Sequence, residues 1–113
     1  IAVISKVNQI RHENEALQQT NNIKFCHIEN ENLMAFYKWN DSKTNELLII
    51  ISLDNFNAQR GTVKLPLQEL GVSPGHKIGL NDLITQSSYD WYSEWNYVEL
   101  HPTLPFHIFK INK

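Results

Sequence analysis

The sequence lacks several features that define whole classes of protein. It has no apolar stretch of the roughly 18 residues that a membrane-spanning helix needs, and no signal peptide is recognisable. Its single cysteine, Cys26, excludes an internal disulfide. The ten Lys and Arg residues are scattered singly and the formal net charge is -2, so no basic cluster is available for a phosphate backbone or an anionic membrane. We therefore expect neither nucleic acid nor a membrane as a partner.

Residues arranged for chemistry are also scarce. The five histidines lack the i, i+2 and i, i+4 spacings of metal ligands, and the four glycines are too dispersed to form a phosphate-binding loop. No Gly-x-Ser-x-Gly nucleophile elbow is present. His27 and His107 could meet across a sheet, but we interpret them as surface or strand histidines. Cys26 is interpreted as a buried structural thiol. We assign no catalytic, cofactor or metal residue.

The sequence does contain a run of seven apolar or near-apolar residues, Leu47–Leu53, which is closed by Asp54-Asn55. A strand with one buried face alternates between apolar and polar residues, whereas this run is apolar at both parities. Both of its faces should therefore be covered. The run predicts the central strand of a small β-rich domain that also packs against something else.

The first residues predict an amphipathic helix from Ile1 to about Arg11, followed by a helical turn at residues 15–19. No Ser, Thr, Asp or Asn precedes this helix to cap it. We therefore expect residues 1–20 to be the end of the last helix of a preceding domain, and residues 21–113 to be a separate domain. The apolar side of the helix consists of Val3, Ile4, Val7, Ile10 and Leu17.

From Ile23 onward the sequence predicts short strands separated by polar turns. Their spacing of roughly 8–12 residues is typical of an antiparallel sandwich. The fold class predicted is mainly β: an antiparallel β-sandwich of Greek-key type with about eight short strands, preceded by an N-terminal helix. The strands are expected at residues 23–28, 33–39, 47–53, 62–67, 77–84, 88–91, 95–100 and 106–111.

An aromatic cluster, Trp91, Tyr92, Trp95 and Tyr97 with Tyr89 beside it, is the only segment with ligand-binding potential. Flat indole and phenol rings can stack on the apolar faces of sugar rings, and nearby polar side chains could bond the hydroxyl groups. Alternatively, the rings fill space between a hairpin and its neighbours, as aromatic cross-strand pairs do. Both interpretations stay open at this point.

Several segments together resemble the alpha-amylase superfamily. Residues 10–18 resemble the end of its barrel, where a helix ends in an Arg-x-x-Asn-Pro-Ala-Leu-like sequence, and residues 46–54 resemble the apolar run of the C-terminal domain that follows. Residues 83–91 and 96–102 resemble the closing hairpin of that domain, which typically reads Leu-Thr-Gly-x-x-Tyr-x-Trp and then Asn-Tyr-Val-x-Leu-x-Pro. Residues 106–109 resemble its final strand.

The resemblance runs nearly end to end and is closest to the maltosyltransferase branch, which moves maltosyl units from maltose 1-phosphate onto α-1,4-glucan. Trehalose-synthase-like members are next closest. Three residues depart from the family pattern. Gln86 stands where Gly is usual, which predicts a differently shaped turn, Glu15 stands where Pro is usual, and His101 stands where Asp is common.

The resemblance implies that the catalytic Asp and Glu residues lie in an upstream barrel rather than in these 113 residues. It further implies a non-catalytic C-terminal domain that packs on the catalytic barrel and stabilises it. Self-association of the parent enzyme and contact with α-glucan are further possible roles, and the maltosyltransferase branch implies a cytoplasmic protein. The alternative function is an accessory carbohydrate-binding module that stacks α-glucan on Trp91, Trp95 and Tyr97.

Overall fold

The computed structural model describes residues 2–113, with side chains from Ser5 onward. Helix α1 (Ala2–Glu13) and the short 3-10 helix η1 (Glu15–Gln18) come first. The remainder is mainly β, as expected. It comprises β1 (Ile23–Cys26), β2 (Leu33–Trp39), β3 (Glu46–Ser52), β4 (Gln59–Lys64), α2 (Leu67–Leu70), β5 (Ile78–Asp82), β6 (Ser88–Trp91), β7 (Trp95–Leu100) and β8 (Phe106–Asn112).

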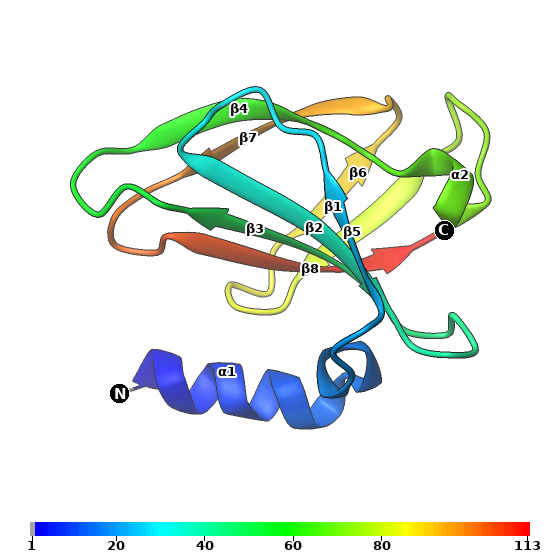
Figure 1. The fold of residues 1–113 in the computed structure, drawn as a ribbon, viewed down its shortest axis with the longest axis horizontal. Coiled ribbons are helices and arrows are strands. Elements are labelled where there is room, and N and C mark those ends of the chain that lie inside the picture. The colour runs from blue at the N-terminus through cyan, green and yellow to red at the C-terminus, as the bar shows by residue number, and fades with distance from the viewer. Residues whose placement is uncertain (1) are drawn as a thin grey trace.

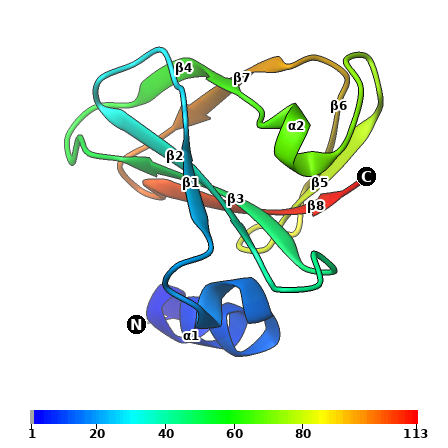
Figure 2. The same ribbon diagram turned by 45° about the vertical axis from the view of Figure 1, so that its right-hand side comes forward.

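The described strands form two antiparallel sheets. The larger sheet has the order β1-β2-β3-β8-β5-β6, and the smaller sheet contains β4 and β7. Figure 1 shows the larger sheet lying between the smaller sheet and α1, and the turned view in Figure 2 shows the same three layers. The predicted antiparallel sandwich of eight short strands is confirmed. Because β8 lies between β3 and β5, the order is non-consecutive, which agrees with a Greek-key type of connection.

Strand β3 is buried on both faces, as its apolar pattern predicts. Leu48 and Ile50 belong to the main core between the two sheets. Leu47 and Ile49, at the opposite parity, lie in a second core on the side of α1. The strand pairs with β2 on one side and with β8 on the other, so it is internal in the sheet as well. Its continuous apolar sequence is thus explained by burial on two faces.

The second core lies between the six-stranded sheet and the N-terminal helices. Ile10 is buried there, and Leu17 packs against it. Val7 is half-buried, so the predicted apolar side of the helix is confirmed at these three positions. The other expected members fall outside the side chains that the structure describes. These members are Val3 and Ile4.

Some strand boundaries differ from expectation. The segment 62–67, predicted as one strand, is divided, because β4 ends at Lys64 and Leu67 begins α2. Gly71 closes α2 with φ = 73°, the left-handed conformation in which glycine carries no Cβ penalty. The alternating apolar residues of this segment nonetheless reach the main core, as Val63, Leu65 and Leu67. None of the helices in the described part of the chain has both the length and the apolar character to cross a bilayer.

Candidate functional site

The aromatic residues expected to bind sugar lie on β6, on β7 and in the turn between them, but they do not share one face. Trp91 points into the sandwich, where its ring centroid lies 5.8 Å from that of Phe109. Tyr92, in the turn, is 56 % exposed. Trp95 and Tyr97 occupy the parity of β7 opposite to its core residues and are exposed. The cluster seen in the sequence is therefore divided in space.

Trp95 has polar neighbours on the outer face of the two-stranded sheet. Its cross-strand partner is Lys64, whose Nζ atom lies 5.8 Å from the centroid of the Trp95 ring. The ring also meets the imidazole of His27 edge-on at 5.5 Å. His27 therefore lies against Trp95, and His107 finds other partners, so the two histidines do not form the pair considered from the sequence.

A small cavity is lined by residues of β6, β7 and β8, and both β6 and β7 are edge strands of their sheets. We call it the aromatic slot. Its volume is about 170 Å³. The sequence cluster contains three of its residues, but it gave no sign of the contributions from β8, because β8 is distant in the sequence. The slot is lined by Tyr89, Trp91, Tyr97, Val98, Glu99, His107 and Phe109.

The floor of the aromatic slot is a set of rings in mutual contact. Phe109 is buried, and the ring of Tyr89 meets it edge-on at 5.9 Å. The His107 ring stacks on Phe109 at 5.1 Å, with an interplanar angle of 24°. Trp91 is the third neighbour of Phe109. Because these rings hold one another, the slot is already formed without a ligand.

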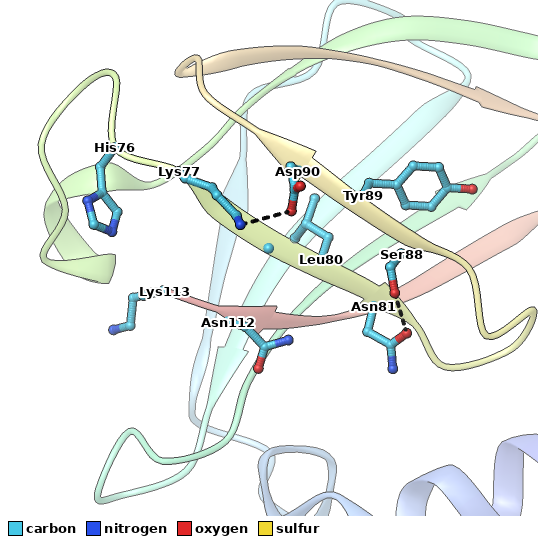
Figure 3. A pocket seen from close by; sticks show the side chains of 10 residues that line it. His76, Lys77, Leu80, Asn81, Ser88, Tyr89, Asp90, Asn112 and Lys113 are labelled. Carbon is cyan, nitrogen blue, oxygen red and sulfur yellow. Dashed lines mark hydrogen bonds and ion pairs between the residues drawn. The ribbon is translucent and has the colours of Figure 1, made fainter.

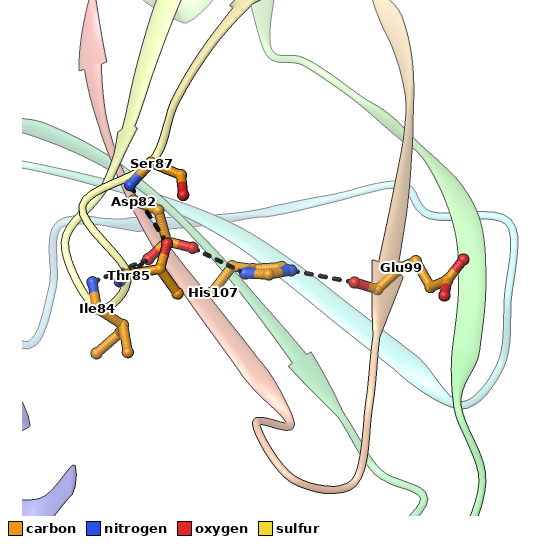
Figure 4. Close-up of polar contacts among 6 residues, drawn as sticks. All are labelled: Asp82, Ile84, Thr85, Ser87, Glu99 and His107. Carbon is orange, nitrogen blue, oxygen red and sulfur yellow. Dashed lines mark hydrogen bonds and ion pairs between the residues drawn. The ribbon is translucent and has the colours of Figure 1, made fainter. Parts of the chain in front are cut away.

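A buried polar chain runs beside the slot and is drawn in Figure 4. His107 Nδ1 lies 3.1 Å from Oδ2 of Asp82, and His107 Nε2 lies 3.1 Å from the backbone carbonyl oxygen of Glu99. The other carboxylate oxygen of Asp82 accepts hydrogen bonds from the backbone N–H groups of Ile84 and Thr85. The chain thereby connects β8 with the β5–β6 turn and with β7.

The two ionisable members of this chain shift each other's titration. Burial alone lowers the pKa of His107, but its hydrogen bonds to Asp82 and to the Glu99 carbonyl outweigh burial, so the net pKa is raised. Burial raises the pKa of Asp82, but the bond to His107 and the two backbone N–H groups lower it overall. Both shifts favour the charged pair, imidazolium and carboxylate.

The Glu99 carboxylate lies at the same parity of β7 as Tyr97, opposite to the core residues Val98 and Leu100, and points away from His107 in Figure 4. The hydroxyl group of Tyr97 donates to its Oε1 at 2.6 Å, and Nε2 of His101 lies 2.8 Å from its Oε2. The bond from Tyr97 is the main cause that lowers the pKa of Glu99. A charged acceptor therefore stands next to the exposed Tyr97 ring.

A larger, shallow depression of about 570 Å³ lies over the other end of β5, as Figure 3 shows. Two of its charged groups pair with each other, since Lys77 Nζ lies 4.0 Å from Oδ1 of Asp90, and Lys113 pairs with Glu46 at 2.7 Å. Ser88 bonds Asn81 across the same two strands. The polar groups with a contact in the structure pair with each other or with neighbouring residues, and we assign no chemistry to the depression.

The face of the six-stranded sheet that faces α1, here named the helix-side face, remains apolar beyond the area that α1 and η1 cover. Phe25 and Phe36 pair across β1 and β2 on this face, with ring centroids 5.9 Å apart. Phe36 packs on the second core, whereas Phe25 is 62 % exposed. Ile23, at the same parity of β1, is exposed as well. An apolar edge is therefore available for contact with another surface.

The N-terminal helices are fixed to the sheet by two asparagines. Asn14 is buried between α1 and η1, and its side-chain oxygen accepts a hydrogen bond from Nδ2 of Asn45 at 2.9 Å. Oδ1 of Asn45 in turn accepts from the backbone N–H of Ala16 at 2.9 Å. Asn14 also donates to the carbonyl oxygen of Ile10. Asn14 belongs to the motif noted in the sequence, but its partner in the β2–β3 loop could not be identified there.

The other candidate groups have ordinary structural surroundings. Among the described residues, no three His, Cys, Asp or Glu side chains come together to hold a metal ion. Cys26 is half-buried rather than fully buried and packs against the main core, and burial raises the pKa of its thiol to about 11. The thiolate is the reactive form of cysteine, so this thiol is poorly suited to be a nucleophile.

Comparison with known proteins decides the family. The family model described as "GLGE, C-terminal" matches residues 25–111. The chain belongs to this family. It is similar to proteins named alpha-1,4-glucan:maltose-1-phosphate maltosyltransferase. The protein from Chlorobaculum tepidum is 40 % identical over 96 % of the chain and 17 % of that protein. The protein from Corynebacterium glutamicum is 41 % identical over 88 % of the chain and 14 % of that protein.

The chain spans less than a fifth of the length of these two relatives. Solved structures confirm the fold. A maltogenic alpha-amylase from Thermotoga neapolitana matches 95 % of the chain and 24 % of its own chain, with a TM-score of 0.65 at 8 % identity. An Anoxybacillus alpha-amylase matches 99 % of the chain and 22 % of its own, with a TM-score of 0.65 at 14 % identity. The predicted resemblance to the C-terminal domain of the maltosyltransferase branch is confirmed by the family model and by the named relatives.

Proposed function

We propose that this chain is the non-catalytic C-terminal domain of an α-glucan enzyme of the maltosyltransferase type, and that it packs on the catalytic barrel and stabilises it. In this proposal the barrel precedes the domain in the same polypeptide, and residues 1–20 are the end of its last helix. The relatives are long enough to contain such a barrel, since the chain matches only 14–17 % of the two described above.

The observation that carries the proposal is the apolar helix-side face. A monomeric protein rarely leaves adjacent large apolar side chains uncovered without a partner for them. Phe25 and Ile23 are exposed beside a core that α1 and η1 already cover in part. A barrel surface lying against α1 would extend this core over β1. Burial of one such side chain contributes on the order of 1.5–3 kcal/mol.

Phe25→Asp tests this contact when it is made in both the full-length protein and the isolated chain. We expect the substitution to lower the Tm of the full-length protein, because a charge would enter a buried apolar contact. In the isolated chain Phe25 is exposed, so the Tm should change little. Tyr92→Asp is the matched control, since Tyr92 is an exposed aromatic in a turn far along the chain. Equal Tm changes for Phe25→Asp in the two settings would contradict docking through this face.

A second role, contact with α-glucan, is favoured by the exposed rings. Trp95 and Tyr97 are exposed at the same parity of one strand, which suits a flat sugar chain. Trp95→Ala should then weaken the binding of maltoheptaose to the chain. Self-association through the helix-side face stays a prediction. A mass of the full-length protein that rises with concentration, and returns to the monomer value in Phe25→Asp, would support it.

A further inference from the structure

We propose that the β3–β4 loop is a second contact between this chain and the catalytic barrel, with the ring of Phe56 at its centre. The inference rests on the proposed function, and it extends the barrel contact from the helix-side face to the end of the sandwich. The loop comprises residues 53–58, between β3 and β4. Its two large apolar side chains, Leu53 and Phe56, are 55 % and 88 % exposed. Phe56 is the most exposed large apolar side chain in the described part of the chain.

Hydrogen bonds to Asp54 fix the loop in the conformation that exposes Phe56. The Oδ1 atom of Asp54 accepts from the backbone N–H groups of Phe56 at 2.8 Å and of Asn57 at 3.1 Å. Its Oδ2 atom accepts from Nε2 of Gln59 at 2.7 Å. These bonds lower the pKa of Asp54, the bond from the Phe56 N–H most of all, so the carboxylate is charged at neutral pH. A side chain that an ordered loop presents loses little conformational freedom when it binds.

The loop continues the apolar surface of the helix-side face. Ile51 pairs with Phe106 across β3 and β8, and both side chains pack against the second core. Leu53 follows Ile51 at the same parity, and its backbone N–H donates to the Asn32 carbonyl oxygen at 2.7 Å, which prolongs the pairing of β3 with β2. An uninterrupted apolar row therefore extends from the second core to the loop. The row consists of Leu47, Ile49, Ile51 and Leu53.

The catalytic barrel is the partner that this arrangement favours. Figures 1 and 2 show the β3–β4 loop and the N-terminal end of α1 at the same end of the molecule. In the proposed function α1 is the end of the last barrel helix, so the barrel adjoins this end. The chain matches only 14–17 % of the two maltosyltransferases described above, which leaves most of their length to supply a covering surface. Aromatic side chains such as Phe are enriched at the buried centre of protein interfaces.

The test is the reactivity of a thiol at position 56 in the full-length protein. Phe56→Cys is compared with Tyr92→Cys, which alters an exposed aromatic at the opposite end of the sandwich. N-ethylmaleimide alkylates each thiol in the folded and in the urea-unfolded protein, and mass spectrometry of the peptides gives the rate at each position. Covered by the barrel, the thiol at position 56 should react at least about tenfold more slowly in the folded protein, whereas the thiol at position 92 should stay within about threefold of its unfolded rate.

The central place of Phe56 in the contact also predicts a loss of stability. Phe56→Asp should lower the Tm of the full-length protein by about 3 °C or more, because a charge would enter a buried apolar contact. Tyr92→Asp is the control and should change the Tm by less than about 1 °C. An unchanged Tm in Phe56→Asp would overturn the place of Phe56 in the contact.

The thiol rates also separate the barrel from other partners. Protection at position 56 that is the same at every protein concentration would support the contact with the barrel. Protection that grows with concentration would overturn the barrel as the partner and assign the loop to a second copy of the protein. A thiol at position 56 as reactive as the one at position 92 would overturn the loop contact altogether. If Phe25→Asp still lowers the Tm of the full-length protein in that case, docking through the helix-side face stands and only the loop contact is wrong.

Discussion

His107 joins three strands through its two ring nitrogens. Nδ1 faces the Asp82 carboxylate and Nε2 faces a backbone carbonyl, and both of these groups are hydrogen-bond acceptors. A neutral imidazole carries only one N–H and would leave one of these contacts without a hydrogen. The protonated form satisfies both. At the scale of the single residue, the connection between β5, β7 and β8 therefore depends on a proton.

This proton makes stability depend on pH. The pKa of His107 is raised above its ordinary value of 6.5 in the folded state, so the folded state binds the proton more tightly than the unfolded state. The contribution is complete below pH 6.5 and is lost as the pH rises through the raised pKa. We expect the free energy of unfolding, measured in urea, to fall as the pH rises above about 6.5 and through the raised pKa of His107.

His107→Gln is the comparison for the pH experiment. Glutamine can donate a hydrogen bond to one of the two acceptors but does not titrate. We expect the variant to be less stable at pH 6 and to lose the downward slope that the parent chain shows at higher pH. Asp82 keeps its charge throughout this range, because its pKa is lowered and its contribution is lost only in acid. The same slope in both proteins would show that another group causes it.

At the scale of the elements, the N-terminal helices depend on few contacts. Besides the apolar second core, they are joined to the sheet by the exchange of bonds between Asn14 and Asn45, and by Lys38, which donates to the Gln19 carbonyl. A helix of 12 residues is marginal by itself in water. The position of α1 on the helix-side face is therefore set by the sheet.

Asn45→Ala should weaken the attachment of the two N-terminal helices, α1 and η1, to the sheet. The substitution leaves the buried side chain of Asn14 and the N–H of Ala16 without their partner, which costs about 1–3 kcal/mol. We expect the free energy of unfolding to fall by that amount and the Ala16 amide to exchange with solvent faster. Asn55→Ala, at an exposed asparagine in the β3–β4 loop, is the matched control and should leave both unchanged. Normal protection of Ala16 in Asn45→Ala would contradict the assignment.

The elements that the sequence predicts correctly are those whose own pattern determines burial. Leu47–Leu53 is apolar at both parities, and β3 is covered on both faces. The alternation of apolar and polar residues could not predict where β4 stops. Val63, Leu65 and Leu67 are all buried, but Leu67 is already the first residue of a helix. Gln86, which departs from the family pattern, takes φ = 67° in the β5–β6 turn, a conformation that favours glycine.

The candidate site was harder to predict for a geometric reason. Trp91 and Trp95 are four residues apart, yet a turn reverses the chain between them and places their rings on different surfaces. The partners that complete the aromatic slot, Phe109 and His107, come from β8, whose place beside β5 is set by non-local pairing. Asn45 likewise meets Asn14 only in the folded chain.

At the scale of the whole molecule, the sandwich has two surfaces that differ in character. The aromatic slot opens at the edge between the sheets, and the helix-side face carries α1 and exposed apolar side chains on β1. A domain joined to a barrel through such a face gains stability from it, whereas a domain that is only tethered unfolds by itself. These two situations differ in how the full-length protein melts.

Differential scanning calorimetry of the full-length protein, compared with the isolated chain, tests the docking proposal most directly. Docking predicts that the transition of this domain moves to a higher temperature in the full-length protein, or merges with the transition of the barrel. Phe25→Asp should return it towards the Tm of the isolated chain. A separate transition at the Tm of the isolated chain, unchanged by Phe25→Asp, would contradict the account.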